Sequence, residues 1–165
     1  DYIKSLKLEN MVVVSPDAGG AKRARAFSWA LEADLAIIDK KRDGNKDRSA
    51  VYGIIGDVKD KVAILVDDEI DTGGSIVNSV NALMEAGATK VYAACTHPVF
   101  SANAIEKLSG SKLAQVIVTN TISIRGDYDP SRIKVLSIGK LLSKAIRRIH
   151  EGTSVSALFS KYKTI

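Results

Sequence analysis

The sequence predicts an α/β fold with a parallel, doubly wound sheet flanked by helices, and three observations support this class. Short apolar runs without a polar face alternate along the chain with stretches of helical apolar spacing. Such runs are typical of strands buried on both faces and joined by crossover helices. Several runs end in glycine turns or acidic residues, as expected at the carboxyl edge where open sheets bind ligands. The chain has no internal repeat, so we expect one domain over residues 1–165.

The expected elements follow from these patterns in chain order. Apolar runs predict strands at residues 11–14, 35–38, 51–55, 62–66, 90–95, 115–119 and 134–138. Apolar residues at helical spacing predict helices at residues 1–10, 21–32, 76–84, 102–109 and 139–150. The strand at 51–55 is expected to return beside the one at 62–66, because only a short polar connection separates them. Residues 154–159 form an apolar tail that we expect to dock on the domain.

The most informative stretch is VAILVDDEIDTGGSIVN, at residues 62–78. Its apolar strand stops at an acidic cluster, and a short turn with two glycines then leads into a helix. Consecutive backbone N–H groups over residues 71–75 can converge on an anion at the start of that helix. Asp67 and Asp68 would repel a bare phosphate, so they fit a partner that carries hydroxyl groups or Mg²⁺. A phosphate nest beside two such acids predicts a site for a sugar phosphate.

Two common phosphate-binding motifs do not match this stretch. A Walker A loop requires GxxxxGK[ST], but Ser75 is followed by Ile76 and the turn contains no lysine. A dinucleotide fingerprint places its glycines first and an acid about 20 residues later, whereas the acids come first here. The remaining alternative is a solvated acidic loop. Four acids within residues 67–71, at the end of a buried strand, would be energetically unfavourable in a loop without a ligand.

Three other segments lie at the ends of predicted strands. The turn SPDAGG, residues 15–20, places Asp17 at the carboxyl edge of the first strand, where it serves a ligand or caps the following helix. The charged residues 39–48 follow the second strand. They are either mobile cations that close over phosphates or a solvated hairpin tip without a role. His97 follows the strand at 90–95, and we expect it to orient its loop rather than to catalyse.

Composition narrows the class of function. The net charge of +5 is compatible with nucleic acid, but the basic residues are dispersed and aromatic residues make up only 5% of the chain, which leaves no stacking platform. We therefore expect no nucleic-acid partner, and we interpret Lys22, Arg23 and Arg25 as a solvated helix face. No apolar run is long enough to cross a bilayer, so no membrane partner is expected, and the first residues do not resemble a signal peptide. Because Cys95 is the single cysteine, we expect a buried thiol and a cytoplasmic location.

Five motifs in a fixed order resemble one family. They are SPDAGGAKRA (15–24), DKKR (39–42), DDEIDTGGS (67–75), THPVFS (96–101) and SVSALFS (154–160). The acidic motif alone is similar to the ribose-phosphate binding motif of phosphoribosyltransferase-type folds. All five together resemble the C-terminal half of the ribose-phosphate pyrophosphokinase (PRPP synthetase) family, and the likeness covers nearly the whole chain. One departure follows Ser101, where the family has Gly-Pro-Ala and this chain has Ala-Asn-Ala.

This resemblance implies a type I phosphoribosyltransferase-like fold and a set of site residues. The family's reaction transfers the β,γ-diphosphoryl group of ATP to ribose 5-phosphate in the presence of Mg²⁺, and gives PRPP and AMP. The residues that match the family's ribose 5-phosphate site are Asp67, Asp68, Asp71, Thr72, Gly73, Gly74 and Ser75. Those that match its pyrophosphate loop are Asp17, Ala18, Gly19 and Gly20. Lys40 and Arg42 match the catalytic cations. Asp17 matches a Mg²⁺ ligand, and Asp67 and Asp68 reach the ribose directly or through that metal.

The family's enzymes contain a second half of the same fold, which contributes residues to the ATP pocket. That half would precede residue 1, so the resemblance implies a truncated synthetase or an isolated domain that binds ribose 5-phosphate or PRPP but forms PRPP poorly. Members of the family assemble as dimers and hexamers, which implies a homo-oligomer. Two alternatives stay open. A catalytically inert regulatory subunit should have lost acids of the central motif, and a phosphoribosyltransferase should carry a hood over its acceptor base; neither feature is visible in the sequence.

Overall fold

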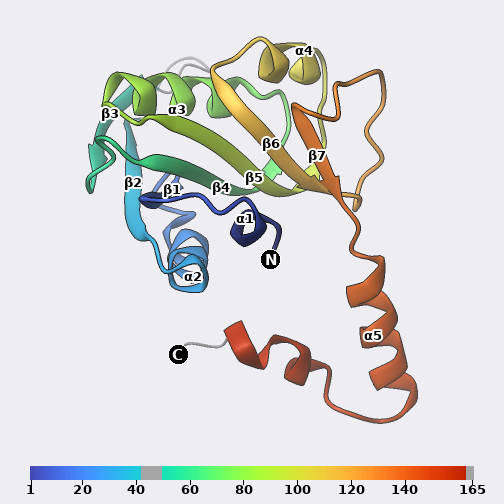
Figure 1. Ribbon diagram of the computed structural model, residues 1–165. Coiled ribbons are helices and arrows are strands. Elements are labelled where there is room, and N and C mark those ends of the chain that lie inside the picture. Colours follow the sequence, from blue (N-terminus) through green and yellow to red (C-terminus); the bar gives the residue numbers. More distant parts are fainter. Residues whose placement is uncertain (42–49, 163–165) are drawn as a thin grey trace.

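One mixed sheet of seven strands forms the centre of the computed structural model, which describes residues 1–41 and 50–162, with side chains at 1–39 and 53–159 (Figure 1). The strands are β1 (Met11–Ser15), β2 (Asp34–Lys41), β3 (Ala50–Ile55), β4 (Val62–Ile70), β5 (Lys90–Pro98), β6 (Leu113–Thr119) and β7 (Ile133–Leu136). Their order across the sheet is β3-β2-β1-β4-β5-β6-β7, and every neighbouring pair except β2 and β3 is parallel. The predicted doubly wound α/β fold is confirmed, with one antiparallel strand at its edge.

Helices cover both faces of this sheet (Figure 1). They are α1 (Tyr2–Ser5) and α2 (Ala21–Leu31) on one face, and α3 (Gly74–Glu85) and α4 (Ala104–Ser109) on the other. Successive residues of a strand point to opposite faces. Val13 therefore packs with Ala24 of α2, whereas Val12 joins the cluster that contains Leu83 of α3. The strands are apolar on both sides because both sides are covered.

The order of the strands reverses beside β1. The chain passes from β1 to β2 on one side and later places β4 on the other side, where Met11 pairs with Val62. In open α/β sheets, ligands bind in the crevice at the carboxyl ends of the strands that flank such a reversal. The turns that follow β1 and β4 therefore share the position that this fold favours for a site.

The prediction that residues 51–55 lie beside residues 62–66 is wrong. β3 pairs antiparallel with β2, with Ile37 opposite Ile55. β4 already has β1 and β5 as its neighbours. β2 also extends beyond its predicted end to Lys41, so two strands that are close in sequence pair in the antiparallel manner typical of consecutive strands.

The first helix is shorter than predicted. It covers Tyr2–Ser5 rather than residues 1–10, because Lys7 and Asn10 adopt φ values of 51° and 48°. These values lie in the left-handed region, which an α-helix of L-residues cannot contain. Ile3 is buried, and it packs on the same face of the sheet as α2.

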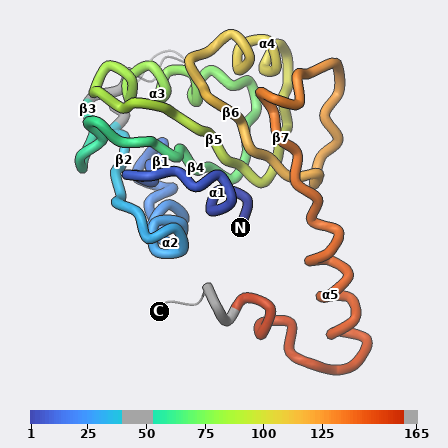
Figure 2. The backbone as a smooth tube through the Cα atoms, viewed as in Figure 1, coloured from blue at the N-terminus to red at the C-terminus, as the bar shows by residue number. Residues whose placement is uncertain are grey.

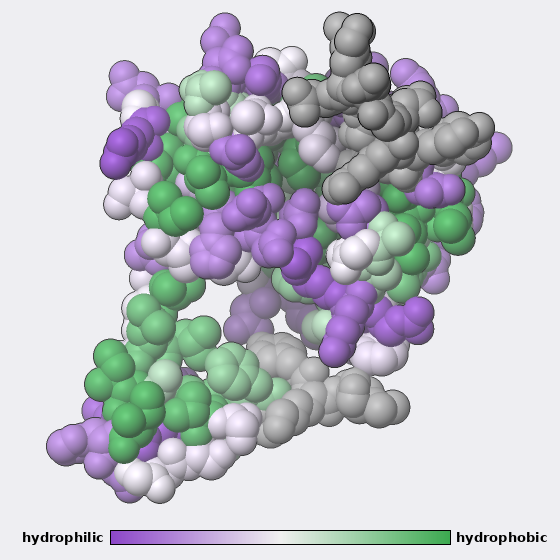
Figure 3. Space-filling view, turned by 180° about the vertical axis from the view of Figure 1, so that it is seen from behind, coloured by the Kyte–Doolittle hydropathy of each residue, from purple (hydrophilic) through white to green (hydrophobic). Residues whose placement is uncertain are grey.

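The last helix, α5 (Gly139–His150), has the predicted bounds but leads away from the sheet (Figure 2). None of its residues is buried, and the 3-10 helix η1 (Val155–Tyr162) packs against it. Phe159 remains 44% exposed, so the expected docking of the tail on the domain is not found among the described residues. Apolar surface extends along this arm of α5 and η1 (Figure 3). Among the described residues, no helix is long and apolar enough to span a bilayer.

Candidate functional site

The corner between β4 and α3 holds the acidic residues of the central motif. β4 runs to Ile70, so Asp67 and Asp68 belong to the strand rather than to a turn that follows it. Val66 is buried, Asp67 is partly exposed and Asp68 is exposed, and the strand returns to the core at Ile70. Asp67 is opposite Cys95 on β5, and that thiol is buried as predicted. A paired strand therefore supports the acids and fixes their backbone positions.

Gly73 makes the turn from strand to helix possible. It caps the N-terminus of α3 with a φ of 74°, a left-handed conformation that favours glycine. A Cβ atom at this position would also lie 3.4 Å from the side chain of Leu108. α3 begins at the next residue, so the N–H groups of its first turn, which have no partner within the helix, lie at the same corner as the acids.

The residues of this corner line a cavity of about 290 Å³ together with Asp17 from the turn after β1. The lining consists of Asp17, Asp67, Asp68, Glu69, Ile70, Asp71, Thr72, Gly73, Ser75 and Ile76. Two predicted groups of site residues thus meet in one place, although they are far apart in the sequence. Of the residues in these two groups, Ala18, Gly19, Gly20 and Gly74 are not part of the lining. The volume is at the lower end of the range for ligand pockets, which suits a small polar ligand.

Arg23 was not predicted as a site residue, and its interpretation as part of a solvated face is wrong. From the first turn of α2, its Nη1 atom lies 3.0 Å from Oδ1 of Asp67, and its Nη2 atom lies 2.7 Å from Oδ2 of Asp68. One guanidinium therefore connects both acids. This contact could be predicted only from the pairing of β1 with β4, because that pairing brings the start of α2 beside the acids.

The two neighbouring carboxyl groups differ in acidity. Burial raises the pKa of Asp67 to about 6, and the adjacent Asp68 carboxyl adds to the rise. The pKa of Asp68 is lowered, chiefly by the hydrogen bond with the Asp67 side chain. The positive charge of Arg23 favours the ionised form of both groups. Asp67 therefore takes up a proton at higher pH than Asp68, and Asp68 is the group that stays charged.

The turn after β1 is organised by hydrogen bonds to Asp17. The backbone N–H of Gly20 donates to Oδ1 of Asp17 at 2.9 Å, and the Ser15 hydroxyl donates to the Asp17 carbonyl at 2.7 Å. Gly20 is the N-cap of α2, and no side-chain hydrogen bond caps this helix. The bond from Gly20 to Asp17 therefore orders the turn, and the capping role given as the alternative for Asp17 is not found. A Cβ atom at Gly20 would lie only 2.6 Å from the Ser15 hydroxyl oxygen, and this close approach explains the glycine.

The two predicted catalytic cations lie at or beyond the limit of the described residues. Lys40 belongs to β2, where its backbone pairs with Val51, but its side chain is outside the described residues. Arg42 lies entirely outside them. Their assignment as catalytic cations stays a prediction. The charged segment begins later than predicted, because β2 continues to Lys41.

His97 lies in β5, which extends to Pro98 rather than ending at residue 95. Its Nδ1 atom lies 3.0 Å from the Thr121 hydroxyl oxygen. That hydroxyl also donates to the carbonyl of Thr96 at 2.9 Å. These contacts connect the end of β5 with the segment after β6, as expected for a histidine that orients its loop.

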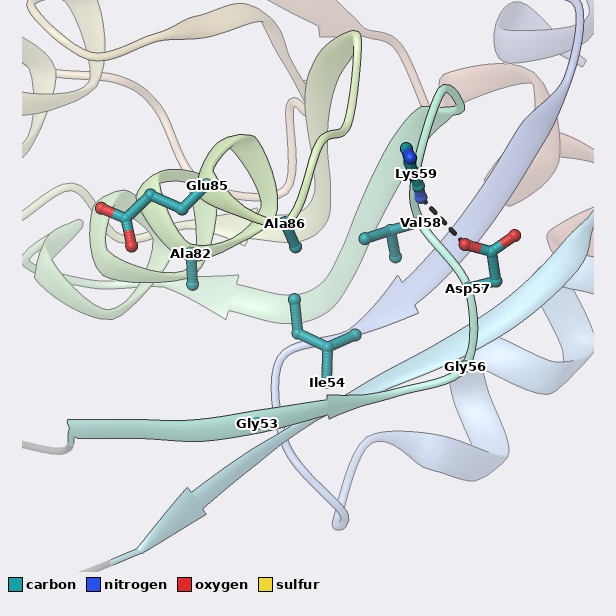
Figure 4. A pocket seen from close by; sticks show the side chains of 9 residues that line it. All are labelled: Gly53, Ile54, Gly56, Asp57, Val58, Lys59, Ala82, Glu85 and Ala86. Atoms are coloured by element: carbon teal, nitrogen blue, oxygen red, sulfur yellow. Dashed lines mark hydrogen bonds between the residues drawn. The ribbon is translucent and has the colours of Figure 1, made fainter.

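A larger cavity of about 490 Å³ lies between β3 and α3 (Figure 4). Ile54 points into it from β3, below α3, and Val58 points into it from the side, toward Ala86 (Figure 4). Of the two acids that line it, Asp57 and Glu85, Asp57 is paired with Lys61 at 3.1 Å. The cavity adjoins the segment that leads into β4, whereas ligands of such sheets bind at the carboxyl ends of the strands. Its size alone does not make it the better candidate.

The acids of the smaller cavity fit Mg²⁺ only in company with a ligand. Among the described residues, no three His, Cys, Asp or Glu side chains are grouped so that they could hold a metal ion by themselves. Mg²⁺ in proteins commonly uses one or two carboxylates together with water and substrate phosphates. Asp17 suits this role, because it lies in the turn after β1 and, like Glu69 and Asp71 of the same cavity, outside the Arg23 ion pairs. Asp67 and Asp68 suit it less, because a guanidinium already lies against them.

Comparison with known proteins connects this chain to one family. Residues 43–160 match the family model of the phosphoribosyl synthetase-associated domain. The chain is 52% identical over 153 residues to a ribose-phosphate pyrophosphokinase of Clostridium acetobutylicum, which covers 93% of this chain and 48% of the relative. A ribose-phosphate pyrophosphokinase of Bacillus subtilis is 47% identical over 160 residues, or 97% of this chain and 50% of the relative. The chain thus spans about half the length of these curated relatives.

Solved structures show the same likeness. A phosphoribosylpyrophosphate synthetase from Mycobacterium smegmatis superposes with a TM-score of 0.79 at 40% identity, over 92% of this chain and 49% of that one. An APRTase from Giardia lamblia superposes with a TM-score of 0.55 at 15% identity, over 71% of each chain. The second likeness shows a shared fold alone, whereas the first agrees with the sequence relatives in both fold and family.

Proposed function

Because this chain belongs to the family of phosphoribosyl synthetase-associated domains, we propose that it is part of a ribose-phosphate pyrophosphokinase and supplies its ribose 5-phosphate site. The observation that carries this proposal is the single cavity in which Asp17 meets the acids and the glycine turn of the corner between β4 and α3. Such a cavity offers hydrogen-bond acceptors to hydroxyl groups and backbone donors to a phosphate.

The parts of ribose 5-phosphate match the parts of this cavity. Residues 71–75 bind the 5-phosphate through backbone N–H groups at the start of α3, where the helix dipole favours an anion. Thr72 and Ser75 add hydroxyl groups to that end of the cavity. Asp67 and Asp68 accept hydrogen bonds from the ribose hydroxyls, which are donors that carboxylates bind well.

The proposed reaction moves the β,γ-diphosphoryl group of ATP to the anomeric hydroxyl of ribose 5-phosphate, and AMP leaves. Such a transfer needs positioning and charge compensation more than covalent participation of the protein. Residues 17–20 form the pyrophosphate side of the site, and Asp17 is the proposed contact of Mg²⁺. When bound there with ligand phosphates, Mg²⁺ supplies positive charge to the diphosphoryl group. Lys40 and Arg42 stabilise the same charge from the segment at the end of β2.

The chain alone is proposed to bind these ligands but to form little PRPP. Residues 1–165 form one domain in this proposal, and a second half of the synthetase completes the ATP pocket. The relatives are about twice as long as the part they share with this chain, which supports this division. A homo-oligomer, either a dimer or a hexamer, and a location in the cytoplasm are also part of the proposal, without nucleic-acid or membrane partners.

Calorimetric titration with and without Mg²⁺ tests the proposed site. Ribose 5-phosphate and PRPP should bind, whereas ribose without its phosphate and purine bases should not. Absence of binding by both phosphorylated sugars would overturn the proposal. A coupled assay for AMP from ATP and ribose 5-phosphate tests the second part, and formation of AMP at ordinary enzyme rates would show that the chain is complete as a catalyst.

The two alternative functions have less support. An inert regulatory subunit is disfavoured because Asp67, Asp68 and Asp71 are all present and line the cavity. A phosphoribosyltransferase is disfavoured because the relatives with high identity are pyrophosphokinases. The titration separates these alternatives as well, since a purine phosphoribosyltransferase would bind a base in the presence of PRPP.

A further inference from the structure

The ion pairs of Arg23 define a role that the sequence did not indicate. We propose that Arg23 is a positioning residue that holds Asp67 and Asp68 as one pair for reading two adjacent sugar hydroxyls. This inference rests on the proposed function, because it assumes that the ligand is a pentose phosphate. It adds a residue on α2 to a site otherwise built from the turn after β1 and the corner of β4.

The geometry shows that one side chain connects both acids. Asp67 and Asp68 are consecutive residues of β4, and their carboxyl groups lie close enough to share a hydrogen bond. Arg23 joins them from α2, because its two terminal nitrogens contact one carboxylate each, at 3.0 and 2.7 Å. The side chain of Asp67 is 26% exposed and that of Asp68 is 61% exposed, so polar contacts rather than packing hold Asp68 in place. The planar fork of a guanidinium fixes both groups at once, which a lysine could not do.

Further contacts hold the carboxylates in the same arrangement. The N–H of Asp68 donates to Oδ1 of Asp67 at 2.9 Å, and the N–H of Glu69 donates to Oδ1 of Asp68 at 3.1 Å. Each carboxylate oxygen has two lone pairs, so these bonds leave acceptor positions for ligand hydroxyls. The guanidinium itself stays charged at all relevant pH values, and it opposes direct binding of a second cation at these acids. The arrangement therefore favours hydroxyl groups over Mg²⁺ at Asp67 and Asp68.

Discrimination between two ligands tests this role. Calorimetry with ribose 5-phosphate and with 2-deoxyribose 5-phosphate measures how strongly the chain reads the hydroxyl that differs between them. A hydroxyl bound by a positioned carboxylate should favour ribose 5-phosphate about ten- to hundredfold. In the Arg23→Gln variant the preference should fall to about threefold or less, and in Arg23→Lys it should take an intermediate value. The matched control is Arg25→Gln, which removes the same charge from an exposed position of α2 and should keep the full preference.

The outcomes separate this inference from the function on which it rests. A wild-type chain that binds neither sugar phosphate overturns the proposed function. A wild-type chain that discriminates, together with an Arg23→Gln variant that discriminates equally well, overturns the role of Arg23 and leaves the proposed function intact. Equal weakening of both ligands in Arg23→Gln also contradicts positioning, because a purely structural contribution would not change the ratio. Thermal unfolding of each variant verifies that it is folded.

Discussion

The substitution Gly73→Ala is expected to destabilise the folded chain, whereas Gly74→Ala is not. Gly73 has a φ of 74°, and a Cβ atom there would lie 3.4 Å from the side chain of Leu108. The contact is within ordinary range, so the backbone conformation dominates. A left-handed conformation costs a residue with a Cβ atom about 1–2 kcal/mol. The free energy of unfolding should fall by that amount.

Gly74 is the matched control at the next position. It is the first residue of α3, and a Cβ atom there would meet nothing closer than the Thr72 hydroxyl oxygen at 3.9 Å. Alanine in a helix is favoured over glycine by up to about 1 kcal/mol. Gly74→Ala should therefore leave the free energy of unfolding unchanged or raise it.

Urea denaturation and thermal unfolding measure both variants. A difference of 1 kcal/mol corresponds to a shift in Tm of about 2–4 °C for a domain of this size. If residues 71–75 bind the 5-phosphate as proposed, calorimetry should also show weaker binding of ribose 5-phosphate by Gly73→Ala, because the turn that presents their N–H groups is distorted. Equal stabilities of the two variants would refute the argument that Gly73 is required for its backbone conformation.

Three further predictions concern other buried groups. Burial raises the pKa of Asp67 to about 6 from 3.8. The stability that its protonated form contributes should therefore be present below about pH 4 and lost as the pH rises through 6. The free energy of unfolding should depend less on pH in Asp67→Asn, and an unchanged pH dependence would contradict this. Burial also raises the pKa of the Cys95 thiol to about 12. Iodoacetamide at pH 8 should therefore label the folded chain much more slowly than the chain unfolded in urea. Similar labelling rates would place the thiol at the surface. Leu83→Ala removes a fully buried side chain of α3 and should lower the free energy of unfolding by about 2–5 kcal/mol; a loss well below this range in urea denaturation would show that the site collapses around the smaller residue.

Local patterns in the sequence predicted the fold class and the corner of β4, because strand runs and glycine turns depend on neighbouring residues. The place of β3 depends on which strand it pairs with, and an apolar run at residues 51–55 looks the same beside either partner. The early end of α1 depends on the conformation of Lys7, whose residue type gives no warning of a positive φ. Periodicity therefore located the elements better than it located their neighbours or their ends.

The residues of the candidate site also fall into those that local patterns predicted and those that depend on the order of the strands. Asp17 and residues 67–75 were predicted because each group lies at the end of an apolar run, and the structure brings Asp17 and most of residues 67–75 to one cavity. Arg23 was missed because a basic residue on a polar helix face resembles many solvated ones. Its contact with Asp67 and Asp68 follows only from the order of the strands, which a single sequence does not reveal.

The pairing of β1 with β4 also determines when the site can form during folding. β2 and β3 lie between these strands in the chain, so Met11 meets Val62 only after a long loop has closed. Closing such a loop costs conformational entropy, and parallel pairing between distant segments is slow for this reason. The hairpin of β2 and β3 can assemble from neighbouring residues alone, but Asp17, Arg23 and Asp67 have no common location until the central strands have joined. A nascent or refolding chain would thus acquire the proposed affinity for a pentose phosphate late, and binding of this ligand would report completed assembly of the centre of the sheet.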